Sequence, residues 1–443
     1  MKKILILSIC ISLAIFLFGC DNSKKEVINK GEKDNKKEIT IVTWNGVTHP
    51  VCDIYKQTFE MENNVEVNYE SIDTTTYEDY LKKLNSKLYL EDGPTMILLR
   101  SEDVYGNYAK QGVALEITEK SVPNINKLYK GFTRDKNYYV PISMYHYPMI
   151  ITKKCLEDLN MESPSLEWSK EDYLKIKDKW LKKEPRPFSY REYCDIVKYP
   201  LRNMELFNED EEKIEIDKVK KYIKSAKKQI YSGNYILNKD HKYDKYIKFF
   251  KNYNDQDVLD LLKYNEAKND SLLSRGMVYE NGLKFRGIFG VSQDDVVLLP
   301  DIMKDDYQIY TWGFIVNRNG KNTELGLKFI NEILDDKQQI NVYKDSKIGN
   351  FPVIKGIEEE IRRIEKEREI EDRFIKLREH ILDKFNKGEY KVYNSQDSKK
   401  VEFYNMLEED LVKIIFDEKE YSDDELSGKL QKLEEKYNMW LTE

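Results

Sequence analysis

The chain has 443 residues, of which 40% are apolar and 35% are charged, and its formal net charge is −7. That length suffices for two domains of ordinary size. A mildly acidic surface with opposite charges interspersed argues against nucleic acid as a partner, because binding to phosphates requires a basic face.

The first residues have the composition of an export signal. Lys2 and Lys3 precede an almost wholly apolar run over residues 4–18, which is shorter than the roughly 20 apolar residues of a membrane-spanning helix. Gly19 and Cys20 then stand where a lipobox has its cleavage site. We predict that residues 1–19 are a signal peptide and that Cys20 is lipidated. A plain signal peptide that ends by chance in cysteine is the alternative.

Residues 20–38 are polar, rich in lysine and free of aromatic side chains, which predicts a disordered tether. Loss of residues 1–19 removes two lysines and leaves 71 basic against 80 acidic side chains, a net charge of −9. Two acyl chains hold a protein on a bilayer much better than one. We therefore predict a lipoprotein at the cell membrane, anchored on its extracytoplasmic face.

The mature chain opens with strands and helices in alternation. Residues 38–44 alternate and are β-branched, which predicts a strand, while residues 50–61 and 65–69 predict a helix and a second strand. Thr75-x-x-Glu78 matches a capping box ahead of leucines at helical spacing. Residues 96–99 form a short apolar run typical of a strand buried on both faces. This order predicts an α/β domain.

The second half shows the same kinds of element. Residues 296–299 and 310–316 predict strands, and residues 324–334 predict a helix. Residues 357–385 carry apolar side chains at spacings of three and four, which predicts one or two amphipathic helices that Gly388 ends. Such a face can bind a coiled-coil partner, but we expect it to pack on its own domain.

The sequence indicates a last helix near the end of the chain, and one inner segment is harder to assign. Ser422-x-x-Glu425 matches a capping box before a last helix. Residues 239–270 are rich in Lys, Asp, Asn and Tyr, and we place them only loosely as helical.

Common catalytic motifs are missing. The sequence has no H-E-x-x-H, no G-x-S-x-G and no Gly-rich phosphate loop. Besides Cys20, the mature chain keeps Cys52, Cys155 and Cys194, which form no C-x-x-C pair, so we expect buried thiols rather than disulfides or a zinc site. We predict a protein that is not an enzyme and that uses no cofactor and no metal.

Three blocks of the chain resemble the extracellular solute-binding proteins of ABC importers, family 1, within which the maltodextrin-binding type is most similar. The first, residues 39–46, resembles the opening strand and its ligand-facing turn. The second, residues 93–118, resembles the third strand, its acidic loop and the next helix, and residues 140–153 then resemble a first hinge crossing. The third block resembles a second crossing, its helix and the segment before the final return, over residues 312–317, 325–334 and 350–353.

The resemblance implies an α/β, two-lobe periplasmic-binding-protein-like fold with hinge crossings and a ligand cleft. Lobe 1 would comprise residues 39–145 plus 308–355, and lobe 2 residues 146–307 plus 356–443. Ligands of open α/β sheets bind outside the carboxyl ends of the strands. Residues 185–300 match the family poorly, and much of the second lobe's ligand contact would come from there.

Aromatic and amide side chains at strand ends are candidate ligand contacts. Trp44 and Asn45 end the first strand, where an indole face can pack on a sugar ring and an amide can both donate to and accept from hydroxyls. A core Trp followed by a turn Asn is the alternative. Trp312 follows the second crossing, and binding and core packing are equally open for it.

Polar candidates follow the third strand and the first crossing. The carboxylates of Ser101-Glu102-Asp103 could accept hydroxyls or bind a cation, and Asp103 best matches the family's acidic position. A helix N-cap with an acidic first turn is the alternative. Tyr145 aligns with a polar family position that faces ligand. We expect His146 to be a packed or solvated hinge residue.

The function implied is capture of a small solute, with an oligosaccharide favoured, and its delivery to the permease subunits of an ABC transporter. We expect a monomer. One alternative is a lipoprotein of the same fold that serves as a sensor or adhesion partner. Another is a secreted hydrolase, because two carboxylates suffice for a glycosidase and any sequence can supply them.

Overall fold

The computed structural model describes residues 37–100, 106–132, 136–188, 190–208, 213–237, 274–279, 282–285, 293–302, 307–344, 350–392 and 398–442. The chain divides into two units, Met1–Lys37 and Glu38–Glu443, and the elements below belong to the second unit apart from Lys37. The predicted signal peptide, Cys20, the tether up to residue 36 and the segment 239–270 lie outside the described residues. None of the described helices is both long and apolar enough to span a membrane.

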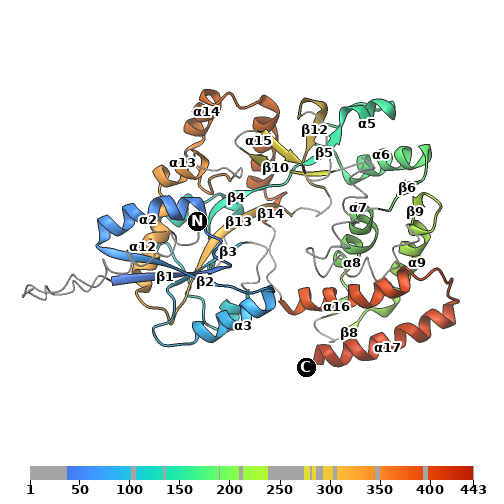
Figure 1. Ribbon diagram of the computed structural model, residues 1–443, viewed down its shortest axis with the longest axis horizontal. Helices are drawn as coiled ribbons and strands as arrows, with labels where there is room; N and C mark the ends of the chain where they lie inside the picture. The colour runs from blue at the N-terminus through green and yellow to red at the C-terminus, as the bar shows by residue number, and fades with distance from the viewer. Residues whose placement is uncertain are drawn as a thin grey trace, which may run out of the picture. The chain divides into compact units, whose positions relative to one another are not determined.

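Among the described residues, the first sheet has six strands, and the long strand β13 (Tyr307–Val316) pairs with three of the other strands. The others are β1 (Lys37–Trp44), β2 (Val65–Ile72), β3 (Met96–Arg100), β4 (Val140–Tyr145) and β14 (Lys391–Val392), in the order β14-β13-β3-β1-β2 with β4 also on β13. Strands β1 and β3 are parallel, whereas β13 runs antiparallel to β3 and β4 (Figure 1).

Helices cover both faces of this sheet, because successive strand residues point to opposite faces and both sets are apolar. On one face Ile41 and Leu98 share a core with α2 (Pro50–Asn63) and α12 (Thr323–Ile333). On the other face Val42 and Ile97 share a second core with α3 (Tyr77–Leu88). A buried side chain of this size contributes roughly 2–3 kcal/mol to folding.

The second sheet, in the part of the chain that the structure describes, has four strands in the order β11-β10-β5-β12. They are β5 (Met149–Thr152), β10 (Ser274–Tyr279), β11 (Gly282–Phe285) and β12 (Val296–Leu299), all antiparallel to their neighbours. The chain passes from the first sheet to the second between β4 and β5, and returns between β12 and β13. The first passage falls within residues 140–153, as predicted, whereas the return precedes the predicted residues 312–317, most of which belong to β13.

The remaining described elements are short strands and helices. The short strands pair as β6 (Arg186–Pro187) with β9 (Tyr235–Ile236) and as β7 (Phe207–Asn208) with β8 (Lys213–Ile214). The helices are α4 (Gly106–Lys110), α5 (Lys153–Asp158), α6 (Lys170–Lys183), α7 (Tyr190–Tyr193), α8 (Tyr199–Arg202), α9 (Ile216–Ile230), α13 (Asp336–Lys344), α14 (Glu358–Glu367), α15 (Asp372–Asn386), α16 (Ser398–Ile415) and α17 (Asp423–Thr442), with short 3-10 turns at Pro123–Lys127, Lys130–Phe132 and Gln293–Asp295.

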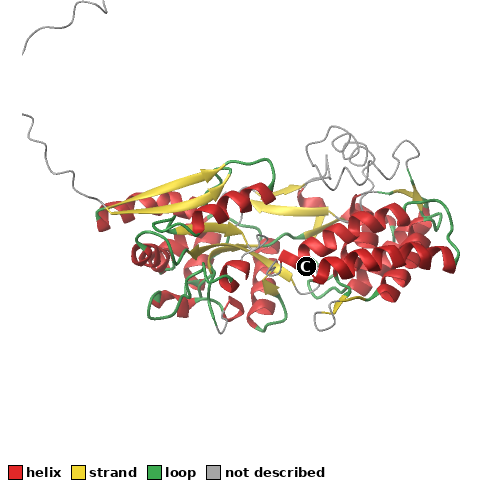
Figure 2. Cartoon of the chain, turned by 90° about the horizontal axis from the view of Figure 1, so that it is seen from below, coloured by secondary structure: helices red, strands yellow, loops and turns green. Residues whose placement is uncertain are grey.

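A separate core unites α7, α8, α9, α16 and α17. In Figures 1 and 2 the C-terminus lies among these helices. Between α7 and α8 the helix widens into a π-turn over Cys194–Lys198. Pro200 explains the widening, because proline has no N–H to donate to the carbonyl four residues earlier. The Tyr222 hydroxyl donates to the Val197 carbonyl at 2.8 Å and satisfies one backbone acceptor of this turn.

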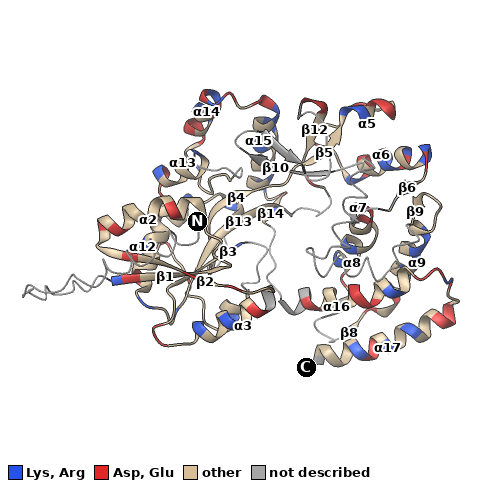
Figure 3. Cartoon of the chain, viewed as in Figure 1, with Lys and Arg blue, Asp and Glu red and all other residues tan. Residues whose placement is uncertain are grey.

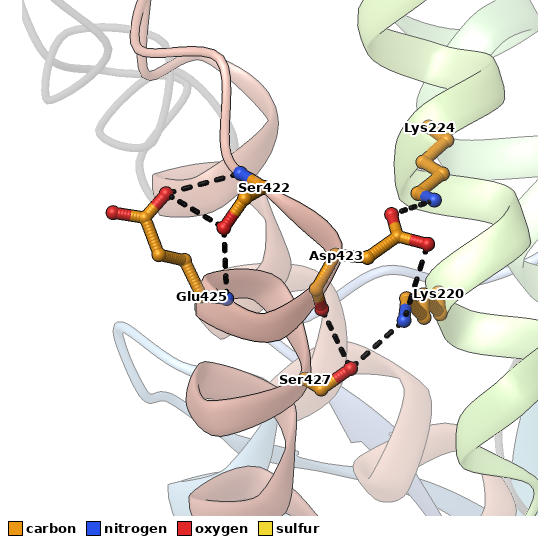
Figure 4. A network of polar contacts seen from close by, with 6 residues as sticks. All are labelled: Lys220, Lys224, Ser422, Asp423, Glu425 and Ser427. Atoms are coloured by element: carbon orange, nitrogen blue, oxygen red, sulfur yellow. Dashed lines mark hydrogen bonds and ion pairs between the residues drawn. The ribbon is translucent and has the colours of Figure 1, made fainter.

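Polar contacts at the start of α17 fix it against α9 (Figure 4). The Ser422 hydroxyl accepts from the Glu425 N–H at 3.3 Å, and the Glu425 carboxylate accepts from the Ser422 N–H at 3.0 Å, so the predicted capping box is confirmed. Lys224 of α9 pairs with Asp423, and Lys220 donates to Ser427 at 2.8 Å. Charges of both signs are interspersed on these helices (Figure 3).

The predicted strands at residues 38–44, 65–69, 96–99, 296–299 and 310–316 are confirmed, as are the helices at 50–61 and 324–334, with ends shifted by a few residues. The first capping box is wrong by one position. Thr76 is the N-cap of α3, because its backbone is extended and its hydroxyl accepts from the Asp79 N–H at 3.2 Å. Three consecutive threonines precede the helix, and sequence does not distinguish them.

The predicted amphipathic stretch 357–385 forms two helices, α14 and α15. The turn between them includes Glu369, whose φ is 53°. Their apolar faces pack in the main core of the same chain, as expected. Gly388, with a φ of 77°, ends this stretch. The three described cysteines are free thiols, with Cys52 and Cys194 buried.

The predicted limits of the two lobes stay a prediction. Strand β14, from the range assigned to lobe 2, pairs with β13 of lobe 1. The main core likewise contains side chains of β5 and β12 beside those of the first sheet.

Gly313 provides a test of the pairing around β13. A Cβ at this position would lie 2.4 Å from the Val140 carbonyl oxygen of β4, whereas one at Gly428 in α17 would meet no atom within 4 Å. We expect Gly313→Ala to lower the free energy of unfolding by about 3 kcal/mol. Gly428→Ala should raise it by about 1 kcal/mol, because alanine favours helix. Urea denaturation of both variants measures this, and equal stability of Gly313→Ala and wild type would contradict the pairing.

Candidate functional site

Trp44 and Asn45 end β1 in a turn that Thr74 fixes. The Trp44 Nε1–H donates to the Thr74 hydroxyl at 3.1 Å, and its ring stacks on Tyr80 with centroids 5.9 Å apart. The Asn45 amide accepts from the Thr74 N–H at 2.8 Å and donates to the Thr74 carbonyl at 3.1 Å. Asn45 has a φ of 50°, which asparagine tolerates better than most residues. Its amide nitrogen has one further hydrogen, and its amide oxygen one further lone pair, for another partner.

Trp312 lies at the carboxyl end of β3, because it pairs with Arg100, the last residue of that strand. On its other side Trp312 pairs with Ser143 of β4. Its indole is half-buried and packs against the core that α2 and α12 share. Trp44 packs with the core on the opposite face of the sheet. The two indoles therefore belong to one edge of the sheet but to different faces.

Three tyrosines surround the start of the first crossing. Tyr145 of β4 pairs with Tyr310 of β13, and their rings stack with centroids 5.4 Å apart. Tyr147 packs edge-on against both, at 5.5 Å and 5.0 Å. Tyr145 and Tyr310 are buried, while Tyr147 is half-buried. Of the three, sequence reasoning selected only Tyr145 as a contact residue.

His146, between Tyr145 and Tyr147, is buried as expected of a packed residue. Its ring stacks on Phe351 with centroids 5.5 Å apart, and neither ring nitrogen has a hydrogen-bond partner among the described residues. Burial and the charge of Arg378 lower its pKa to about 4. Arg378 is itself buried and donates two hydrogen bonds of 2.9 Å to Glu365. The ring is therefore neutral at physiological pH.

His49 is a buried residue that the sequence analysis did not select. Its Nδ1 lies 3.3 Å from the Val51 N–H and caps α2. Its Nε2 lies 2.8 Å from the Ser143 hydroxyl and 3.1 Å from Asn350 Nδ2. The ring centroid is 5.8 Å from that of Trp312. A histidine followed by Pro50 at a helix start was a local signal for the cap, but nothing local indicated the other partners.

A serine and a histidine within hydrogen-bond distance invite comparison with a nucleophile and its base. Ser143 is fully buried and His49 is 2% exposed. Burial lowers the pKa of His49 to about 3, and its second nitrogen faces a backbone N–H rather than an orienting carboxylate. This arrangement suits a structural contact and offers no support to the hydrolase alternative.

The predicted polar contacts Ser101, Glu102 and Asp103 lie outside the described residues. The last described residue before them, Arg100, pairs with Trp312. The structure thus brings Trp312 to the end of β3 and Trp44 to the end of the neighbouring parallel strand β1. Parallel strands end at the same edge of a sheet, which is where open α/β sheets bind ligands.

The two buried histidines predict an acid-sensitive fold. Their pKa values, about 3 for His49 and about 4 for His146, lie below the ordinary 6.5. Above pH 6.5 neither state is protonated and stability is unaffected. As the pH falls from 6.5 toward 4, only the unfolded chain takes up these protons, so the free energy of unfolding falls by roughly 1.4 kcal/mol per pH unit for each histidine.

Urea denaturation at several values between pH 7.5 and 4.5 measures this slope. In His146→Phe the stack on Phe351 is retained and one titrating group is lost. The slope should therefore decrease by the contribution of one proton, and an unchanged slope would contradict the assignment.

Residues 53–340 match the family described as bacterial extracellular solute-binding protein. No curated protein matches the chain in sequence.

Several solved structures are similar over nearly the whole chain. An ABC substrate-binding protein from Listeria monocytogenes in complex with cycloalternan is 16% identical, with a TM-score of 0.54, and the match covers 92% of this chain and 100% of that one. A cyclic α-maltosyl-1,6-maltose binding protein from Arthrobacter globiformis is 11% identical, with a TM-score of 0.53 and coverage of 92% and 99%. A family 1 extracellular solute-binding protein from Alicyclobacillus acidocaldarius is 12% identical, with a TM-score of 0.55 and coverage of 92% and 99%. The fold is therefore that of the two-lobe periplasmic solute-binding proteins, as predicted.

Proposed function

The chain belongs to the bacterial extracellular solute-binding protein family, and from this we propose that it captures an oligosaccharide outside the plasma membrane and delivers it to the permease subunits of an ABC importer. The family is defined by solute binding rather than by a reaction, and its members work outside the cytoplasm.

The observation that carries the sugar proposal is the pair of half-buried indoles at the carboxyl ends of the first sheet. Trp44 ends β1, Trp312 lies within β13 beside the end of β3, and each is held by packing before any ligand arrives. Indole faces pack on the apolar faces of sugar rings, and a fixed ring loses little entropy on binding. Two of the similar structures named above are described with cyclic glucose oligosaccharides, which supports the same class.

Polar groups at the same edge would complete such a site. The Asn45 amide has hydrogen-bonding capacity beyond its two bonds to Thr74. The carboxylates of Glu102 and Asp103 would each accept up to two sugar hydroxyls. Tyr147, half-buried beside Tyr145, adds a ring and a hydroxyl. Sugar sites combine stacking with hydroxyl recognition in this way.

We expect the mature protein to be stabilised thermally by maltotriose or by a cyclic glucose oligosaccharide, and not by a polyamine or a dipeptide. Trp312→Ala should weaken the binding of the active sugar at least tenfold, which is about 1.4 kcal/mol. Trp440→Phe, in the separate helical core, is the matched control and should bind normally. Isothermal titration measures the affinities. Failure of every sugar to shift the melting temperature would count against the oligosaccharide.

Attachment to the membrane through Cys20 is a separate part of the proposal. It is supported by Gly19-Cys20 after the apolar run and by the polar segment that follows. In a Gram-positive host, wild type should sediment with membranes, whereas Cys20→Ala should appear in the soluble fraction. Cys52→Ala, which replaces a buried thiol, should stay with the membranes. Membrane retention of Cys20→Ala would show that the anchor lies elsewhere.

A further inference from the structure

One buried side chain contacts three segments that are far apart in the sequence. His49 precedes α2, Ser143 belongs to β4, and Asn350 lies just ahead of Phe351 beyond α13. All three side chains are at least 98% buried. The Met144 N–H also donates to the Phe351 carbonyl at 2.9 Å, so β4 and the segment after α13 are joined by backbone as well. His49 thus lies where the first crossing and the return segment meet.

The hydrogen bonds of a neutral imidazole limit what His49 can do at one time. With the proton on Nε2, Nδ1 accepts from Val51 and caps α2, while Nε2 donates to Ser143. With the proton on Nδ1, the single lone pair of Nε2 accepts from the Ser143 hydroxyl and is shared with the more distant Asn350 amide, but the cap is lost. In either tautomer the bond to Ser143 is retained. The contact with β4 is therefore the constant one, and the cap is the optional one.

Ser143 also pairs directly with Trp312 in the sheet. The histidine ring itself lies beside the indole, with centroids 5.8 Å apart and ring planes at 59°. We propose that His49 is a positioning residue that fixes the Trp312 indole at the carboxyl end of β3 through its bond to Ser143. The consequence for ligand affinity rests on the proposed function, whereas the effect on Trp312 does not.

Two substitutions separate the two nitrogens of the ring. Asparagine places an amide near Nδ1 and is a preferred N-cap residue, so His49→Asn keeps the cap of α2 but does not reach Ser143. Glutamine places an amide near Nε2, so His49→Gln keeps the bond to Ser143. Ser143→Ala removes the same bond from the other side with little change in volume.

The direct readout is the ¹⁹F NMR spectrum of the ligand-free mature protein that carries 5-fluorotryptophan. Trp312→Phe identifies the Trp312 resonance, and the buried Trp168 and Trp180 serve as internal references. We expect His49→Asn and Ser143→Ala to shift or broaden the Trp312 resonance, while His49→Gln leaves it close to wild type. The reference resonances should not move in any of the three variants.

A purely structural role predicts a different result. If His49 only caps α2, His49→Asn would resemble wild type and His49→Gln would be the perturbed variant, which overturns the proposal. Unfolding of either variant would be seen as movement of all resonances, and Ser143→Ala then decides the question alone.

The affinity for maltotriose, measured by titration, separates this inference from the proposed function. Tenfold weaker binding in His49→Asn and Ser143→Ala, with recovery in His49→Gln, would support both. An absence of maltotriose binding by wild type would refute the proposed sugar for this probe. It would leave the assignment of His49 to be decided by the NMR spectra.

Discussion

The pairing of β13 with both β3 and β4 is the constraint on which the other features depend. It joins residues 96–100, 140–145 and 307–316, which chain entropy would otherwise keep apart. The register sets Trp312 opposite Arg100 on one side and Ser143 on the other. Gly313 permits this, since its missing side chain leaves room for the Val140 carbonyl. The candidate site therefore results from strand register rather than from any local motif.

Local patterns were sufficient for elements whose signal lies within a few residues. Alternation predicted β1, a short apolar run predicted β3, and serine with glutamate three residues later predicted the start of α17. Helix α9 was missed although Val219, Ile223 and Ile230 recur at helical spacing, because six lysines dominate its composition. The N-cap of α3 could not be chosen among three threonines, since the deciding factor is the extended backbone at Thr76.

The residues of the candidate site also differ in whether local sequence could indicate them. Trp44 could be selected because it ends a recognisable strand, whereas Tyr145 and Trp312 were selected from their places at the crossings that the family resemblance implies. His49 could not be selected, because its partners are 94 and 301 residues away in sequence. Whether a residue is polar and buried depends on long-range packing, which a single sequence does not express. The aromatic candidates could therefore be named from the sequence, and the group proposed to position Trp312 could not.

Closure of a two-lobe binding protein requires bending at the crossings without disorder at the ligand contacts. Around β4, the residues that hold the Trp312 region and the point at which the chain can bend lie at different positions. Ser143 is held by His49 and by the sheet, whereas the chain leaves the first sheet only after Tyr145. His146 stacks on Phe351 without a hydrogen bond from its ring. The stack has no directional bond to break, whereas breaking a buried hydrogen bond leaves an unsatisfied donor or acceptor. Bending after Tyr145 would thus leave Trp312 in place.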